Sequence, residues 1–206
     1  MTISVFGVPV EASFYTVFLY IPCFLVESVF YFRIIQKRTS LEALFLASTL
    51  SAFLIIIEPG FHELGHALTA VYIEGTIKAI DLLSLTSVTY SKHLGQNEML
   101  IISMAGPLFG LIYTLVSAVI ARYASRQTSV VFGFVAIVSF LDPLFNLLPF
   151  GGLDGASLAI FLHETFVPMM LPVGLYLTIY MAIYTGLAVP AMYILMKILG
   201  KKFFGR

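Results

Sequence analysis

Residues 41–72 read LEALFLASTLSAFLIIIEPGFHELGHALTAVY, a long and mostly apolar run that follows two candidate capping residues, Thr39 and Ser40. As one helix it would be about 48 Å long at about 1.5 Å per residue, well beyond the roughly 30 Å hydrocarbon core of a membrane. Pro59-Gly60 lies inside the run, where a kink is expected. The same run carries His62-Glu63-Leu64-Gly65-His66, and ionisable groups are costly at membrane depth. The stretch therefore predicts a membrane helix that holds functional side chains.

The composition of the whole chain agrees with a membrane protein. Of its 206 residues, 60% are hydrophobic and 11% are charged, whereas a soluble domain carries about 25% charged residues. The mean hydropathy is +1.00. The net charge of zero gives no indication of nucleic-acid binding, and the single Cys23 excludes an intramolecular disulfide and a cysteine zinc cage. We expect one integral membrane domain over residues 1–206.

Apolar runs of about 20 residues predict the membrane-spanning helices. Five such runs are present, at about 13–32, 41–72, 98–121, 129–149 and 169–196, and a sixth helix could be merged into 165–199. The segment 73–97 is rich in β-branched residues and favours a short hairpin. The predicted fold is an all-α polytopic membrane protein with five or six transmembrane helices and a short membrane-associated β-hairpin.

The basic residues predict the orientation of this bundle by the positive-inside rule. With five spans, two basic residues fall on one side, Lys78 and Lys92. The other nine fall on the opposite side: Arg33, Lys37, Arg38, Arg122, Arg126, Lys197, Lys201, Lys202 and Arg206. We expect a multi-pass protein of the cell membrane with its N-terminus outside and its C-terminus in the cytoplasm.

The His62 to His66 segment matches the H-E-x-x-H pattern of zinc proteases. Residues four apart share one helical face, so His62 and His66 can bind one metal ion, while Glu63 can accept a proton without being a ligand. Gly65 leaves room for another element to approach. The alternative is a pair of packing histidines, which would bury polar groups at a cost.

A catalytic zinc ion needs a third protein ligand. The candidates are His93, His163, Glu58, Asp142, Asp154 and Glu164. Asp154 is favoured because Pro149 and nearby glycines predict a broken helix end that turns its carboxylate inward. Glu58 could instead hold an imidazole N–H, and Asp142 could cap or bend the fourth helix or compete as a ligand.

Two further motifs complete a resemblance to the site-2 protease family of intramembrane zinc metalloproteases. That family pairs H-E-x-x-H with N-x-x-P-x-x-x-L-D-G, which this chain matches at Asn146, Pro149, Leu153, Asp154 and Gly155. Ala105-Gly106-Pro107 resembles the family's A-G-P signature, although Leu108-Phe109-Gly110 follows where the family often has an Asn. The resemblance implies a Zn²⁺ cofactor held by His62, His66 and Asp154, with Glu63 as the general base. It also implies that Asn146 holds the substrate backbone or the developing oxyanion.

The expected function is therefore cleavage of a membrane-anchored protein within or near a transmembrane segment, by a catalytic core at about 41–165. The hairpin resembles the family's membrane-inserted β element, which could present an unwound substrate by strand addition. One rival is a prenyl-protein type endopeptidase, in which Glu164 would replace Asp154 as a ligand. Another is a non-catalytic binding protein or transporter with a structural zinc site.

Overall fold

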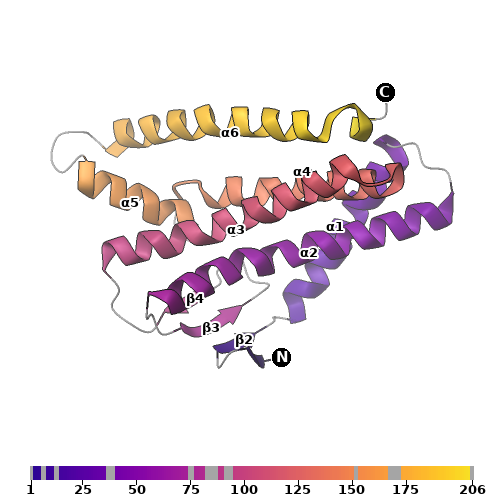
Figure 1. Ribbon diagram of the computed structural model, residues 1–206. Coiled ribbons are helices and arrows are strands. Elements are labelled where there is room, and N and C mark those ends of the chain that lie inside the picture. Colours follow the sequence, from indigo (N-terminus) through magenta and orange to yellow (C-terminus); the bar gives the residue numbers. More distant parts are fainter. Residues whose placement is uncertain are drawn as a thin grey trace.

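Long helices lie side by side in a bundle, and a small sheet lies at one end (Figure 1). The computed structural model describes residues 2–5, 8–11, 14–35, 40–73, 77–81, 88–90, 95–150, 153–166 and 173–204. Its helices are α1 (Phe14–Phe30), the π-helix η1 (Tyr31–Ile35), α2 (Leu41–Tyr72), α3 (Gln96–Tyr123), α4 (Arg126–Asn146), α5 (Asp154–Phe166) and α6 (Val173–Phe204). Its strands are β1 (Thr2–Val5), β2 (Val8–Glu11), β3 (Ile77–Asp81) and β4 (Val88–Tyr90).

Four helices among the described residues are long and apolar enough to cross a membrane: α2, α3, α4 and the Leu175–Leu199 part of α6. They correspond to the last four predicted spans. The predicted span 13–32 corresponds to α1, which has 17 residues and is continued by η1, and it is not among these four helices. The chain is thus an integral membrane protein with four candidate spans, and the count of five or six stays a prediction.

α2 is one continuous helix of 32 residues, so Pro59 bends the chain at most and does not break the helix. Ser40 is the N-cap, and its side chain accepts a hydrogen bond from the Ala43 amide at 3.5 Å. Farther along, a Cβ on Gly65 would lie 2.6 Å from the carbonyl oxygen of Ala105. α3 therefore packs against α2 at Gly65, as the sequence predicts.

The sheet has the order β1-β2-β3-β4. β3 and β4 pair antiparallel inside the segment 73–97, where a hairpin is predicted. β2 pairs with β3 in parallel, and β1 pairs with β2 antiparallel. The sequence prediction missed β1 and β2, because strands of four residues leave little local pattern. The position of the sheet relative to the membrane stays a prediction.

The opposite end of the bundle is held by an apolar core between η1, α2 and α4. Phe32, Ile55 and Val135 are buried there. The ring of Tyr31 stacks on that of Phe134 at a centroid distance of 4.4 Å. The core fixes α2 against α4 and so sets how their distant halves face each other.

After α4 the chain forms a short helix, α5, which begins at Asp154. The sequence prediction missed α5, since the sixth helix that it allowed lies within 165–199. A Cβ on Gly155 would lie 2.2 Å from the carbonyl oxygen of Leu147, so only glycine lets α5 start this close to the end of α4. α5 brings Asp154 back toward the bundle.

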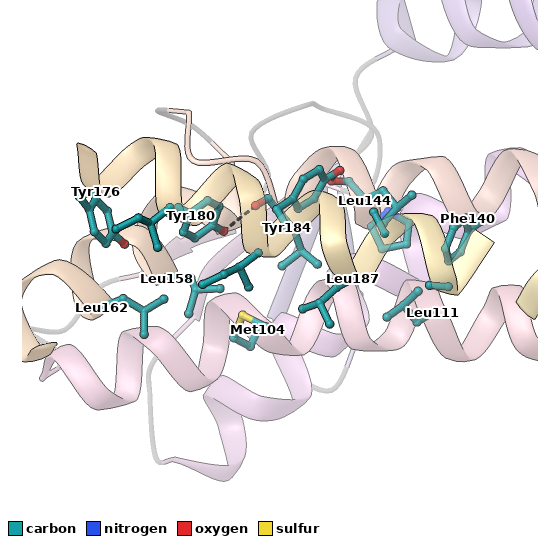
Figure 2. A pocket seen from close by; sticks show the side chains of 16 residues that line it. Met104, Leu111, Phe140, Leu144, Leu158, Leu162, Tyr176, Tyr180, Tyr184 and Leu187 are labelled. Carbon is teal, nitrogen blue, oxygen red and sulfur yellow. Dashed lines mark hydrogen bonds between the residues drawn. The ribbon is translucent and has the colours of Figure 1, made fainter. Parts of the chain in front are cut away.

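α6 covers α3, α4 and α5 across an apolar cavity of about 330 Å³ (Figure 2). Three tyrosines of α6 donate hydrogen bonds to backbone carbonyls of the segments that it covers. Tyr176 donates to the carbonyl of Ala159 at 2.6 Å, Tyr180 to that of Leu147 at 2.7 Å, and Tyr184 to that of Leu144 at 2.7 Å. The carbonyls of Leu144 and Leu147 lie where α4 ends and intrahelical donors run out.

Candidate metal centre

Three side chains meet where α2 passes the start of α5. The Nε2 atom of His62 lies 3.1 Å from Nε2 of His66 and 3.0 Å from Oδ2 of Asp154. The third distance, from Nε2 of His66 to the same Asp154 oxygen, is 3.4 Å. The structure thus brings the three sequence-predicted ligands together, although Asp154 is 88 residues beyond His66 in the chain.

The dimensions of this triangle fit one small cation. In a tetrahedral zinc site with bonds of about 2.0 Å, neighbouring ligand atoms lie about 3.3 Å apart. The three measured distances of 3.0, 3.1 and 3.4 Å are close to that value. Without a shared cation, three acceptor atoms this close together would repel one another or need bridging protons. The donor set therefore fits a divalent metal ion.

Gly106 of α3 leaves the space that such an ion needs. A Cβ at this position would lie 2.3 Å from Nε2 of His66 and 2.6 Å from Nε2 of His62. Any side chain larger than hydrogen would therefore press on both ligating nitrogens. The glycine of the Ala105-Gly106-Pro107 signature thus belongs to the site, a role that its position in the sequence alone does not reveal.

The two imidazoles are oriented through their other nitrogens. Nδ1 of His66 lies 2.7 Å from the carbonyl oxygen of Ile102, so it donates its proton there and leaves the Nε2 lone pair directed at the site. Nδ1 of His62 lies 3.4 Å from Oδ2 of Asp142. Both histidines are buried, with 4% of their surface exposed. They present the same nitrogen to a common point.

Asp154 is the first residue of α5 and is partly buried. Its Oδ2 atom lies 3.0 Å from Nε2 of His62 and 3.4 Å from Nε2 of His66. Asp154 is also in the first turn of a helix, where a carboxylate is favoured by the helix dipole. The Asp154 carboxylate is therefore available as an anionic ligand.

Glu63 is buried beside the two histidines, with 6% of its surface exposed. Ligand atoms of His62, Glu63 and His66 all lie within 4.8 Å of one another. Since Glu63 is one step around the helix from His62, its carboxylate reaches the edge of the site rather than the triangle that includes Asp154. This position suits a group that moves a proton.

Asn146 lies on the last turn of α4, and its Nδ2 donates to Oδ2 of Asp142 at 3.2 Å. The contact of Asp142 with His62 makes it a neighbour of a predicted ligand rather than a competing ligand. Asp142 is four residues before Asn146, a spacing that places both on one helical face. That spacing was the available signal for this pair in the sequence.

The other candidate ligands that the structure describes lie apart from the triangle. Glu164 is ten positions after Asp154 on α5, roughly 15 Å along the helix axis, and its carboxylate accepts a hydrogen bond from the Gln96 side chain. The ring of His163 packs on that of Tyr176. Glu58 is 2% exposed and faces α3, where a Cβ on Gly110 would lie 2.7 Å from its Oε1. His93 lies outside the described residues.

These features define a polytopic membrane protein whose helices bring together a donor set that fits one metal ion. Residues 39–197 match the profile of the family described as Peptidase M50B-like, so the chain belongs to that family of membrane metallopeptidases. Among solved structures, the Site-2 Protease from Methanocaldococcus jannaschii is similar at 20% identity and a TM-score of 0.53, covering 100% of this chain and 92% of that chain. That likeness supports the fold. Comparison with curated proteins gives no match.

Proposed function

We propose that this protein is a zinc-dependent intramembrane endopeptidase. The observation that carries the proposal is the triangle of His62, His66 and Asp154, whose edges of 3.0 to 3.4 Å suit tetrahedral zinc coordination beneath Gly106. Membership in a peptidase family and the site-2 protease fold support it. The substrate class is a membrane-anchored protein cut within or near its transmembrane segment.

In this proposal His62, His66 and Asp154 hold the ion. When bound, zinc supplies Lewis acidity for activating water and polarising a carbonyl. Glu63 accepts a proton as water adds to the peptide carbonyl carbon, and it passes that proton to the amine as the C–N bond breaks. The products are a carboxylate and an amine. A helical substrate hides its carbonyl carbons, so we expect cleavage near helix-breaking residues.

Asn146 is proposed to bind the substrate backbone or the developing oxyanion. Its Nδ2 makes one hydrogen bond, to Asp142. An amide has a second N–H and a carbonyl oxygen, so capacity for substrate remains. The hairpin of β3 and β4 is proposed to pair with an unwound substrate segment, since strand addition exposes carbonyl groups that a helix conceals.

The test uses the full chain purified in detergent. Zinc content and cleavage of a model transmembrane peptide with a central Gly-Pro pair are measured with and without a chelator. We expect one zinc per chain, chelator-sensitive cleavage, and in Glu63→Gln retention of zinc with cleavage reduced by about 10²- to 10⁴-fold. Undiminished cleavage by Glu63→Gln would contradict the mechanism. A zinc-binding protein that cleaves no unwound peptide would favour the non-catalytic alternative.

The orientation is a separate part of the proposal: a cell-membrane protein with a cytoplasmic C-terminus. α3 ends, α4 begins and α6 ends at one end of the bundle, which carries Arg122, Arg126 and Lys197, while the sheet lies at the other end (Figure 1). In a Cys23→Ser background, an impermeant thiol reagent outside intact cells should label Asn97→Cys but not Gln127→Cys, because α3 separates them. Labelling of only the second variant would reverse the orientation.

A further inference from the structure

Asp142 connects Asn146 to the far side of the His62 ring. Its Oδ2 atom accepts a hydrogen bond from Asn146 Nδ2 at 3.2 Å and lies 3.4 Å from Nδ1 of His62. The Nε2 atom of the same ring faces Asp154. The Asp142 carboxylate therefore approaches the imidazole from the side opposite the proposed metal.

We propose that Asp142 is the positioning residue for His62, and that Asn146 holds its carboxylate in place. By accepting a hydrogen bond from Nδ1–H, Asp142 fixes the tautomer in which the Nε2 lone pair points at the ion. It also makes that nitrogen a stronger base. The inference rests on the proposed function only in taking the metal site as given.

The two histidines differ in how they are supported, and the difference singles out Asp142. The Nδ1–H group of His66 donates a hydrogen bond to the backbone carbonyl of Ile102 at 2.7 Å, and no side-chain substitution removes that acceptor. Nδ1 of His62 is buried without a hydrogen bond to a described residue, and Oδ2 of Asp142 lies 3.4 Å from it. Histidines that bind metals nearly always donate their second N–H to a carboxylate, a carbonyl or water. Asp142 is placed to be that acceptor.

The surroundings of Asp142 favour a charged acceptor with a fixed direction. Its side chain is 35% exposed, so the carboxylate keeps contact with solvent while one oxygen faces His62. The spacing of four residues from Asn146 places the amide donor on the same face of α4. Asn146 thus acts on the metal through Asp142, in addition to any contact with substrate.

The test compares Asp142→Asn and Asp142→Ala with the starting protein. The affinity for Zn²⁺ is measured by competition with a chromophoric chelator, and the visible absorption of the Co²⁺-loaded protein reports ligand geometry. We expect zinc binding about 10- to 100-fold weaker, with the larger loss in Asp142→Ala, and an altered cobalt spectrum. Glu42→Gln, an exposed carboxylate on the same helix as His62, is the matched control and should match the starting protein.

A second measurement separates positioning from general stability. Asn146→Ala should weaken zinc binding in the starting protein and have no further effect in the Asp142→Ala background. Melting of the metal-free Asp142→Asn protein should match that of Glu42→Gln. Where Asp142→Ala does not fold, Asp142→Asn decides the outcome.

Unchanged zinc affinity and an unchanged cobalt spectrum in the folded Asp142 variants would overturn the inference, as would equal losses from Asn146→Ala in both backgrounds. A starting protein that binds no zinc would instead refute the proposed function. The two failures are therefore distinguishable.

Discussion

Replacing Gly106 with alanine should remove most of the metal affinity while leaving the bundle folded. The added Cβ would lie 2.3 Å from Nε2 of His66, whereas ordinary contact begins at 3.4 Å, so the imidazole would have to move by 3.4 − 2.3 = 1.1 Å. A misplacement of about 1 Å at a reacting centre costs about 100-fold. Applied to metal binding, this is about 2.8 kcal/mol, since each factor of ten is about 1.4 kcal/mol.

The assay is chelator competition for Zn²⁺ combined with thermal melting of the metal-free protein. Alanine is favoured over glycine in a helix by about 1 kcal/mol, so the metal-free variant should not be less stable on that ground. Gly186→Ala is the matched control, because nothing lies within 4 Å of a Cβ there. A folded Gly106→Ala protein with the starting zinc affinity would refute the assignment of the site to this face of α3.

Three further predictions, each with its own substitution, test separate parts of the structure. Asp154→Ala should reduce zinc content to near zero while Glu164→Ala keeps it, as metal analysis of the purified variants would report; the reverse result would favour the prenyl-protein type of site. Gly65→Ala should destabilise the α2–α3 contact by about 1–3 kcal/mol, because its Cβ would lie 2.6 Å from the Ala105 carbonyl oxygen. A melting temperature equal to that of the starting protein would exclude this close packing. Tyr180→Phe should lower the free energy of unfolding by about 0.5–1.5 kcal/mol, because its hydrogen bond to the Leu147 carbonyl is lost. The matched control is Tyr193→Phe, since Tyr193 is 67% exposed, and the Tyr180 variant should melt at a lower temperature than this control.

Most of the bundle could be predicted from the sequence because a membrane imposes a simple rule. Apolar runs of about 20 residues become helices when no water is present to satisfy the backbone. α2, α3, α4 and α6 follow that rule. β1 and β2 do not, since each has only four residues and β2 pairs with β3, which is far along the chain. α5 was missed because its sequence is flanked by Pro and Gly and is short of a span.

The residues proposed as metal ligands could be singled out because each carries a local pattern. His62 and His66 share a helical face, and Asp154 is the one carboxylate inside a motif rich in Gly and Pro. The support around them could not be predicted in the same way. That Asp142 faces His62, and that Gly106 faces both imidazoles, depends on how three helices pack. Such contacts leave no periodicity in any single segment.

The tyrosines of α6 also bear on how freely this helix can change in sequence. Tyr176, Tyr180 and Tyr184 repeat every four residues and donate hydrogen bonds to backbone carbonyls. A backbone carbonyl is the same whatever side chain its residue carries. On the same helix, Ile179, Ile183 and Leu187 line an apolar cavity (Figure 2). Exchange among aliphatic residues at such positions costs little. Over this part of α6 the directional contacts that specify docking are therefore three hydroxyl groups, whereas Leu195 and Leu199 nearer its C-terminal end are fixed by burial in the core.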